Sequence, residues 1–346
     1  MIEHPARWWH AEGSQVRCDL CPRACLLAEG QAGYCRVRVA RGGELRTWLR
    51  NLHGGLAPDP IEKKPLFHVQ PGSRILSFGT AGCSLSCDFC QNWGLSASSP
   101  EDLGLRRTCA DEIVAAALAA GCGSVAFTYN EPSIGAEWCI EVAEAARAAG
   151  LLSVAVSSAY VGEAAWSDFF GALDAVNLDL KSFSDAFYRR RCKGRLAPVL
   201  ATLEAALKAG TWLEVTTLLI PGENDGDDEV PAAARWIAEH LGPEVPLHFT
   251  AFHPDHHLMD RPPTPLATLR RAREIALAEG LRYVYTGNLP DLEGAATHCA
   301  QCGAMLVERN GFRVTRSRLQ NGACPRCGKK MAGLFGAGPA RPAPGH

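Results

Sequence analysis

Three cysteines, Cys83, Cys87 and Cys90, stand close together in the segment 80–90. Their C-x3-C-x2-C spacing allows three thiolates on one short loop to converge on a single metal centre. A structural zinc ion takes four ligands, and a cubane iron–sulfur cluster contains four irons. Three cysteines therefore predict a cluster in which one iron stays open to an outside ligand. A zinc site completed by a distant histidine is the alternative.

Two further groups of four cysteines lie toward the two ends of the chain. The C-terminal group has two C-x2-C pairs separated by 21 residues, and a glycine follows each pair. This pattern is typical of zinc ribbons, so we expect zinc, with a mononuclear iron or a second cluster as alternatives. For the N-terminal group we expect a structural metal site, with zinc favoured over iron–sulfur; an auxiliary cluster that relays electrons or binds substrate is the alternative. The N-terminal ligands would be Cys18, Cys21, Cys25 and Cys35, and the C-terminal ligands Cys299, Cys302, Cys324 and Cys327.

The composition is that of a globular protein without a basic surface. The chain has 346 residues, 47% of them hydrophobic, and Lys plus Arg (35) nearly balance Asp plus Glu (37) for a net charge of −2. The lack of a basic excess predicts no nucleic-acid partner and no membrane-surface partner. We find no secretory signal at the start and no apolar run that could span a bilayer. We therefore expect a cytoplasmic protein, and in a reducing cytosol the 15 cysteines are better interpreted as metal or cluster ligands than as disulfides.

Short β-branched or apolar runs alternate with Ala/Leu-rich amphipathic stretches from about residue 73 to residue 286. Strict alternation predicts an α/β fold with parallel strands joined by right-handed crossovers. An open doubly wound sheet and a partial barrel both satisfy the pattern, and in both the functional loops follow the carboxyl ends of the strands. Helices are expected to end at Gly121, Gly150, Gly210 and Gly280. The expected strands are Ile75–Gly79, Ser124–Tyr129, Leu152–Ser157, Ala175–Leu180, Trp212–Leu219, Pro246–Phe252 and Arg282–Tyr285.

Composition changes on both sides of this region and divides the chain into four parts. Residues 1–72 form a cysteine-rich metal-binding segment and residues 73–290 the α/β region. Residues 291–335 form a four-cysteine, zinc-ribbon-like module, and residues 336–346 a tail that is expected to be disordered. Four arginines of the C-terminal module are interpreted as a solvated face rather than a nucleic-acid footprint: Arg309, Arg313, Arg316 and Arg318.

The central cysteine loop resembles the signature of the radical S-adenosylmethionine (SAM) enzymes. That signature is C-x3-C-x2-C with an aromatic residue before the last cysteine, the position of Phe89. The resemblance implies a partial (β/α)6 barrel, a 4Fe-4S cluster on Cys83, Cys87 and Cys90, and SAM chelated by the open iron. It also implies the reaction, in which reductive cleavage of SAM gives a 5′-deoxyadenosyl radical that abstracts hydrogen from a substrate. The motifs do not reveal that substrate.

The resemblance extends to polar residues at the ends of later strands, where the family binds SAM. It places Glu131 at the SAM amino group, Lys181 at the SAM carboxylate and His253 close to SAM. The residues alone leave alternatives open: Glu131 could cap the helix that begins at Pro132, and Asp179 with Lys181 could be a solvated charge pair. The implied cofactor-binding set is Phe89, Tyr129, Asn130, Glu131, Ser157, Asp179, Lys181 and His253.

Over nearly its whole length the chain is similar to the radical SAM member of the AmmeMemoRadiSam system, a relative of the pyruvate formate-lyase-activating enzymes. Besides the cysteine groups, the segments 59–66, 219–225 and 284–288 carry this resemblance. It implies a functional link to AMMECR-type and Memo-type proteins, and an electron donor such as flavodoxin or ferredoxin. Two rival functions are an activase that generates a glycyl radical on a partner protein, and a non-catalytic iron–sulfur or zinc protein.

Overall fold

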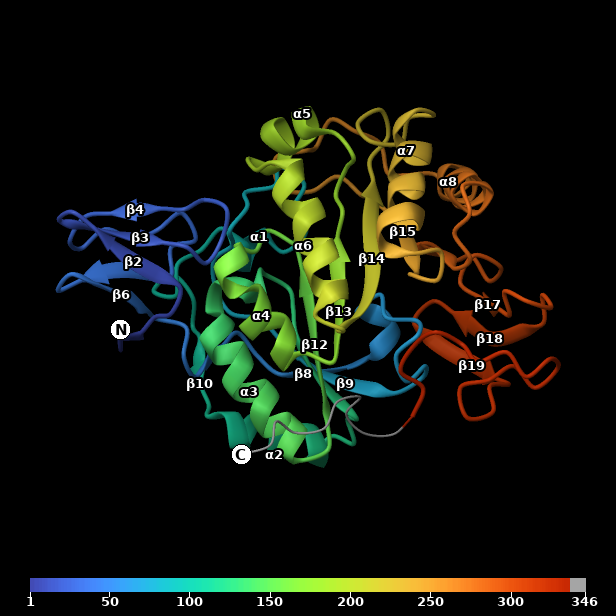
Figure 1. Ribbon diagram of the computed structural model, residues 1–346, viewed down its shortest axis with the longest axis horizontal. Helices are drawn as coiled ribbons and strands as arrows, with labels where there is room; N and C mark the ends of the chain where they lie inside the picture. Colours follow the sequence, from blue (N-terminus) through green and yellow to red (C-terminus); the bar gives the residue numbers. More distant parts are fainter. Residues whose placement is uncertain (337–346) are drawn as a thin grey trace.

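The computed structural model describes residues 1–336, and its centre is an eight-stranded sheet in which seven strands are parallel (Figure 1). Strands and helices alternate as expected, so the α/β prediction is confirmed, and the expected strand bounds agree to within two residues. The parallel strands are β9 (Arg74–Phe78), β11 (Ser124–Phe127), β12 (Leu152–Ser157), β13 (Ala175–Asp179), β14 (Trp212–Leu219), β15 (Leu247–Ala251) and β16 (Val284–Gly287), and β8 (Ala57–Pro60) is the antiparallel edge strand.

Helices connect the consecutive parallel strands. The four glycines predicted to end helices all lie just after one and have φ between 65° and 101°, the left-handed conformation that glycine adopts without strain. The helices are α1 (Trp93–Ser96), α2 (Ala110–Ala119), α3 (Ala136–Ala148), α4 (Glu163–Ala172), α5 (Asp185–Phe187), α6 (Leu196–Lys208), α7 (Glu229–Trp236) and α8 (Leu266–Ala278), with 3-10 turns at Ile61–Lys63 and Pro132–Gly135 and π turns at Tyr188–Cys192 and Ile237–Leu241.

Strand order decides between the two expected architectures. Along the sheet the parallel strands follow one another in the order β9, β11, β12, β13, β14, β15, β16, which is also their order in the sequence. A doubly wound sheet reverses its order at an internal point and carries helices on both faces. Sequential order with right-handed crossovers instead keeps the helices on one face, so the sheet curves around an interior as in a partial barrel. Within residues 1–336 the edge strands β8 and β16 do not pair with each other.

A segment ahead of the first parallel strand crosses the barrel interior, which the sequence analysis did not anticipate. Its first part, β8, pairs with β9 and contains two prolines, which an edge strand tolerates. The chain then buries Ile61, Leu66 and Val69 against residues at the amino ends of the barrel strands. The Asn177 side-chain amide of β13 donates to the Pro65 carbonyl oxygen at 2.8 Å. Residues 61–69 therefore form a floor inside the barrel.

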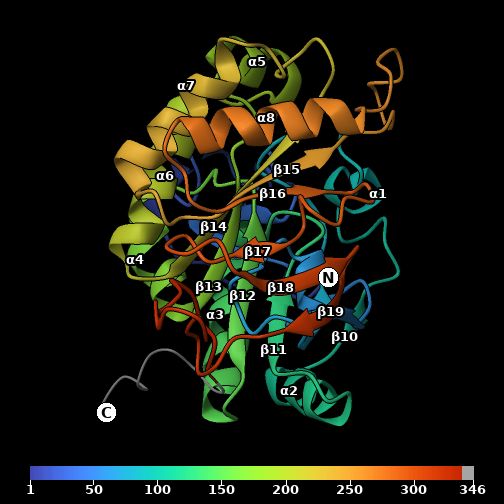
Figure 2. The same ribbon diagram turned by 90° about the vertical axis from the view of Figure 1, so that its right-hand side faces the viewer.

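Two smaller parts lie at opposite ends of the long axis of the molecule (Figure 1). The N-terminal part consists of short antiparallel strands, and the C-terminal part is a three-stranded sheet that packs beside β16 (Figure 2). The strands are β1 (His4–Pro5), β2 (Trp9–Glu12), β3 (Gln15–Cys18), β4 (Leu26–Leu27), β5 (Arg38–Arg41), β6 (Glu44–Thr47) and β7 (Leu52–His53), with β10 (Arg106–Arg107) paired to β7, and β17 (Thr297–His298), β18 (Met305–Asn310) and β19 (Arg313–Ser317) at the other end.

A buried arginine joins the C-terminal sheet to the barrel. Arg309 is 1% exposed, and its guanidinium donates to the carbonyl oxygens of Ala295 and Phe67 and to the Thr297 hydroxyl. It also faces the Glu62 carboxylate at 3.5 Å. The interpretation of Arg309 as part of a solvated face is therefore wrong, because β18 turns this side chain toward Phe67 and Glu62 of the barrel. The other three arginines of that group are exposed or half-buried.

Among the helices of residues 1–336, none has the length and apolar character needed to cross a membrane. Residues 337–346, which make up most of the tail expected to be disordered, lie outside the described residues.

Candidate functional site

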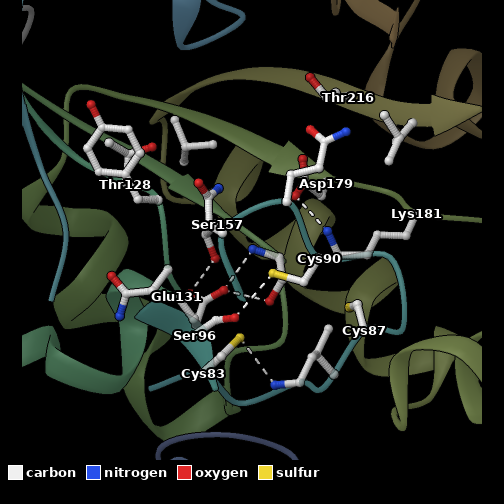
Figure 3. A pocket seen from close by; sticks show the side chains of 18 of the residues that line it. Cys83, Cys87, Cys90, Ser96, Thr128, Glu131, Ser157, Asp179, Lys181 and Thr216 are labelled. Atoms are coloured by element: carbon white, nitrogen blue, oxygen red, sulfur yellow. Dashed lines mark hydrogen bonds and ion pairs between the residues drawn. The ribbon is translucent and has the colours of Figure 1, made fainter. Parts of the chain in front are cut away.

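A cavity of about 250 Å³ lies at the carboxyl ends of the parallel strands, where the sequence places the functional loops. In Figure 3 the three cysteines of the central loop lie along one side, and Ser157 and Asp179 face them from strand ends. The lining contains every residue of the predicted cluster and SAM sites except His253: Cys83, Cys87, Phe89, Cys90, Tyr129, Asn130, Glu131, Ser157, Asp179 and Lys181.

The cysteine loop is anchored to the loop after β11 by one side-chain amide. Asn130 donates through Nδ2 to Thr80 Oγ1 at 3.0 Å and to the Gly82 carbonyl at 2.9 Å, and its Oδ1 accepts from the Thr80 backbone N–H at 2.8 Å. The two loops approach closely because Gly79 has no side chain; an added Cβ would lie 2.7 Å from the Thr128 carbonyl oxygen. Asn130 thus holds the cysteine loop in place through three hydrogen bonds.

The three thiols are half-buried, and negatively charged groups and other thiols lie around them. Burial, followed by the charge of Glu131, raises the pKa of the Cys83 thiol well above its ordinary value. A hydrogen bond with the buried Cys192 thiol, followed by burial, does the same for Cys87. Cys90 lies 3.1 Å from the Ser96 hydroxyl, and burial raises its thiol pKa. A metal centre would supply the positive charge that turns such thiols into thiolate ligands.

The donor set fits a cluster held by three cysteines better than a single ion. The residues that line the cavity include three thiols, two carboxylates and no histidine, so the distant histidine of the zinc alternative is not found there. Across residues 1–336, only the C-terminal cysteines bring three or more potential ligand atoms within 4.8 Å of one another. The central thiols are therefore spaced more widely than ligands of one ion, as the different corners of a cubane require.

Glu131 is a fixed negative charge beside the cysteine loop. Its carboxylate accepts from the Ser133 backbone N–H at 3.0 Å, the Ser157 hydroxyl at 2.7 Å, and both the backbone N–H (2.7 Å) and hydroxyl (2.5 Å) of Ser158. The Ser133 bond caps the helical turn that begins at Pro132, so the capping alternative is realised in the structure. Capping and ligand binding are compatible, because the carboxylate that accepts these four hydrogen bonds also lines the cavity.

Lys181 and Asp179 form the second charged group, on the opposite part of the lining (Figure 3). The Lys181 ammonium donates to the Asp179 carboxylate at 2.8 Å. Burial lowers the pKa of Lys181, but the charges of Asp179, Cys87 and Cys192 outweigh it and raise this pKa well above its usual value. The pair is thus not a solvated surface pair: a cation is held charged next to a cysteine of the central loop.

Tyr129 connects the cavity to the barrel floor. It has a left-handed backbone (φ 72°), and its hydroxyl donates to the Asp59 carboxylate at 3.0 Å. Asp59 also accepts from Lys64 at 2.8 Å and from Lys63 at 3.0 Å, and the Lys64 ammonium lies 4.7 Å from the Tyr129 ring centroid. Burial followed by the Asp59 contact raises the pKa of Tyr129 to about 12. The Tyr129 phenol is therefore neutral, is held in one orientation by Asp59, and lines the cavity.

Two aromatic predictions differ in outcome. Phe89 is buried, lines the cavity and packs 5.7 Å from the Phe187 ring centroid. His253 lies outside the lining on the rim, with a side chain that is 61% exposed and that accepts from the Gln91 amide at 2.9 Å. Gln91 itself lines the cavity, so His253 is connected to the site through its hydrogen bond with Gln91.

Several lining residues were missed by the sequence analysis. Thr216, Thr250 and Asn288 project from β14, β15 and the end of β16, and Ser158 follows β12. The available signal was their position: each stands on or directly after the carboxyl-terminal half of a strand, where barrel side chains alternate inward and outward. Alternation alone does not say which of two neighbours faces inward.

The C-terminal cysteines meet in a compact group away from the cavity. Their sulfurs lie 3.6 Å apart for Cys299 and Cys327 and 3.7 Å apart for Cys302 and Cys324, and all four lie within 4.8 Å of one another. A tetrahedral zinc with bonds of 2.3 Å requires sulfurs about 3.8 Å apart, so the group fits a single ion. The glycine after each pair has a left-handed backbone and closes the turn of its knuckle.

The N-terminal cysteines also come together, at the edge of the N-terminal sheets. Cys18 and Cys35 are buried, and Cys21 and Cys25 are half-buried. Burial, followed by repulsion from the other thiolates of the group, raises the pKa of Cys21 well above its ordinary value. Their spacing is wider than that of the C-terminal group.

The chain is similar to one family model and to several known proteins. The family model of the radical SAM superfamily matches residues 78–237. An uncharacterized protein of Methanocaldococcus jannaschii is 39% identical over 322 residues, which cover 92% of this chain and 96% of that protein. Among solved structures, a domain of a pyruvate-formate lyase-activating enzyme from Bacteroides vulgatus matches at 17% identity and a TM-score of 0.43, covering 48% of this chain and 99% of that one. A radical SAM methyltransferase from Sphaerobacter thermophilus matches at 16% identity and a TM-score of 0.49, covering 68% and 71%.

The family match includes all three central cysteines and both charged groups of the cavity. Members of this superfamily use a 4Fe-4S cluster and SAM, which agrees with three cysteines placed beside a charged cavity. Residues 78–237 of this chain therefore match the radical SAM superfamily as a domain.

Proposed function

We propose that this enzyme binds a 4Fe-4S cluster through Cys83, Cys87 and Cys90, cleaves SAM reductively, and uses the resulting radical to abstract hydrogen from a substrate. The observation that carries the proposal is the convergence of three thiols, two opposite charge groups and a buried aromatic ring in one cavity. When bound, the cluster supplies the electron that breaks the carbon–sulfur bond of the SAM sulfonium.

The charges of the cavity correspond to those of SAM. The Lys181 ammonium is available for the SAM carboxylate, and the carboxylates of Glu131 and Asp179 for its amino group and for its ribose hydroxyls. The Phe89 ring offers a flat apolar surface near the cysteines for the adenine. Each charge is held in place by other groups, so little reorganisation is needed when SAM enters.

The protein contributes orientation and a dry site. Asn130 fixes the cysteine loop relative to the strand ends, and Tyr129 closes the cavity toward the floor. The Cys87 thiol shares a hydrogen bond with Cys192, which is 0% exposed, and this bond raises the pKa of Cys87. With a cluster bound, a hydrogen bond from Cys192 to this ligand sulfur would raise the reduction potential of the cluster. All of these contacts are present in the protein before SAM or a substrate binds.

For the C-terminal group we propose zinc, supported by sulfur separations that fit one tetrahedral ion.

We further propose that the protein works in the AmmeMemoRadiSam system beside AMMECR-type and Memo-type proteins, in the cytoplasm, with a flavodoxin or ferredoxin as electron donor. Pull-down of tagged protein from a source that encodes all three would test this link, and recovery of neither protein would count against it.

The central proposal is tested by anaerobic reconstitution with iron and sulfide, followed by reduction with dithionite in the presence of SAM. We expect 5′-deoxyadenosine from the wild type and none from Cys87→Ala. Cys109→Ser is the matched control, because Cys109 is exposed and does not line the cavity, and it should retain full activity. A fully loaded wild type that forms no product, and whose cluster spectrum does not change when SAM is added, would contradict the proposal.

A second candidate is an activase that forms a glycyl radical on a partner protein. It is favoured by the exposed rim of the cavity: Trp93 is 48% exposed, stacks on His256 at 5.5 Å and donates to Asp255 at 3.2 Å. An ordered, exposed aromatic beside a catalytic cavity is suited to contact with a macromolecule. Incubation with a candidate partner, followed by radical spectroscopy on the separated partner, distinguishes the two; a radical on the partner supports the activase.

A further inference from the structure

The four N-terminal cysteines are drawn together by tight turns in two loops. Cys18 ends β3, and its backbone N–H donates to the Cys25 carbonyl at 2.9 Å, which closes the loop that carries Cys21. Ala24 and Arg36, next to two of the cysteines, have left-handed backbones with φ of 44° and 64°. Each cysteine of the group interacts electrostatically with each of the others. The four side chains thus lie near one another.

Each of the four sulfurs accepts a backbone N–H. The Cys25 sulfur accepts from Tyr34 at 3.5 Å, and the remaining three accept from residues two positions further along the chain. Such bonds stabilise thiolates rather than thiols and are the usual surroundings of cysteines that ligate a metal or a cluster. The three further donors are Leu20 to Cys18, Arg23 to Cys21 and Val37 to Cys35.

The distances between the sulfurs distinguish a site for a single ion from a site for an iron–sulfur cluster. The C-terminal group of this same chain reaches the close packing of a single tetrahedral ion, with all four sulfurs within 4.8 Å of one another. Within residues 1–336, no three of the N-terminal sulfurs do so. A cubane binds each thiolate at a different iron, which holds the sulfurs farther apart than one ion does. The N-terminal group therefore shares the wider spacing of Cys83, Cys87 and Cys90.

The N-terminal group also lies directly against the loop of the central cysteines. An added Cβ on Gly82, the residue before Cys83, would lie 2.1 Å from the Cys35 carbonyl oxygen. On the other side of Cys83, the Ser84 carbonyl accepts from Arg23 Nε at 2.8 Å. Cysteine-bearing loops of the two groups thus touch on both sides of one cluster ligand.

We propose that Cys18, Cys21, Cys25 and Cys35 bind a second iron–sulfur cluster, packed against the loop that carries Cys83. This assignment replaces the structural zinc site that the sequence spacing favoured. It stands independently of the proposed reaction, because it concerns ligands outside the SAM cavity.

The test removes the central cluster and asks what iron remains. In the variant Cys83→Ala/Cys87→Ala/Cys90→Ala, reconstituted anaerobically, we expect about four irons and about four sulfides per chain, with the Mössbauer signature of a cubane. One zinc per chain, about the content expected of the C-terminal group, should remain. Adding SAM should leave the spectrum unchanged. Adding Cys18→Ala/Cys21→Ala to this variant should remove the iron and leave the zinc.

The single exchange Cys25→Ser in the same triple variant guards against misfolding, because it changes one half-buried ligand. It should keep the circular dichroism of the parent and alter the cluster spectrum. A triple variant that folds and carries two zinc ions and no iron would overturn the proposal. So would iron without sulfide, which indicates a mononuclear site.

Discussion

Replacing Asp59 by asparagine removes the countercharge of a buried lysine below the cavity that we propose for SAM. The Asp59 carboxylate accepts from Lys64 at 2.8 Å, from Lys63 at 3.0 Å and from the Tyr129 hydroxyl at 3.0 Å. The Lys64 side chain is 2% exposed, whereas that of Lys63 is 44% exposed. In Asp59→Asn the buried ammonium of Lys64 loses its carboxylate partner, and Tyr129 loses a charged acceptor.

The pKa of Asp59 gives the magnitude of the effect. Burial would raise this pKa, but the hydrogen bonds from Lys64 and Lys63 lower it from the ordinary 3.8 to about 2. At about 1.4 kcal/mol per pKa unit, the difference corresponds to about 2 kcal/mol in the free energy of unfolding. Because a buried lysine without a partner adds its own cost, we expect a loss of about 2–4 kcal/mol in Asp59→Asn.

The sign of the pH dependence follows from the direction of the shift. The pKa of Asp59 is lower in the folded than in the unfolded state, so its stabilisation is present above about pH 4 and is lost as the pH falls toward about 2. Urea unfolding of the metal-loaded proteins under argon, followed by tryptophan fluorescence, measures the effect. The wild type and Asp59→Asn should differ most near neutral pH and converge through this window.

The two lysines provide matched controls. Lys63→Met should cost less than about 1 kcal/mol because its ion pair is exposed. Asp59→Asn combined with Lys64→Met should recover most of the loss, since it removes both buried charges. The reasoning is refuted if Asp59→Asn costs no more than Lys63→Met, or if its loss stays constant down to about pH 3.

Three further predictions concern the cysteine loop, the C-terminal metal and the barrel floor. Gly82→Ala should lose most of the central cluster iron, because the added Cβ meets a backbone carbonyl oxygen at 2.1 Å, whereas Gly94→Ala, with open space around it, should keep it. Cys302→Ser should release the C-terminal ion and lower the thermal midpoint, as measured by metal analysis and calorimetry; equal zinc in Cys302→Ser and Cys109→Ser would contradict the assignment. Glu214→Ala should cost about 3 kcal/mol or more in unfolding free energy, since the fully buried carboxylate accepts four hydrogen bonds, and a loss below about 1 kcal/mol would show that its donors find other partners.

Much of the fold and the centre of the site could be predicted because they depend on local pattern. Alternating apolar strands and amphipathic helices with glycine ends define the barrel strands to within two residues. The three cysteines of the C-x3-C-x2-C loop lie at most seven positions apart, so a cluster site could be predicted from one short segment of the sequence. Strands that end at one rim then bring Glu131, Asp179 and Lys181 to the same cavity.

Contacts between distant segments could not be predicted in the same way. Tyr129 meets Asp59 across 70 positions, and Arg309 reaches the Phe67 carbonyl across 242. His253 was placed near SAM by its motif, but the loop that carries it lies on the rim. Neither hydrophobic periodicity nor motif spacing predicts which of these distant residues make contact. Each contact depends on how the barrel curves and on which segment fills its interior.

By itself the sequence determined the strands, the helix ends, the parallel topology and the identity of the three cysteine groups. Only the tertiary structure decided the separation of their sulfurs, which is close at the C-terminal group and wide at the other two. A residue count between cysteines limits how far apart two thiols can lie, but backbone turns and the packing of neighbouring segments set the actual distance. That distance is what distinguishes a site for one ion from a site for a cluster.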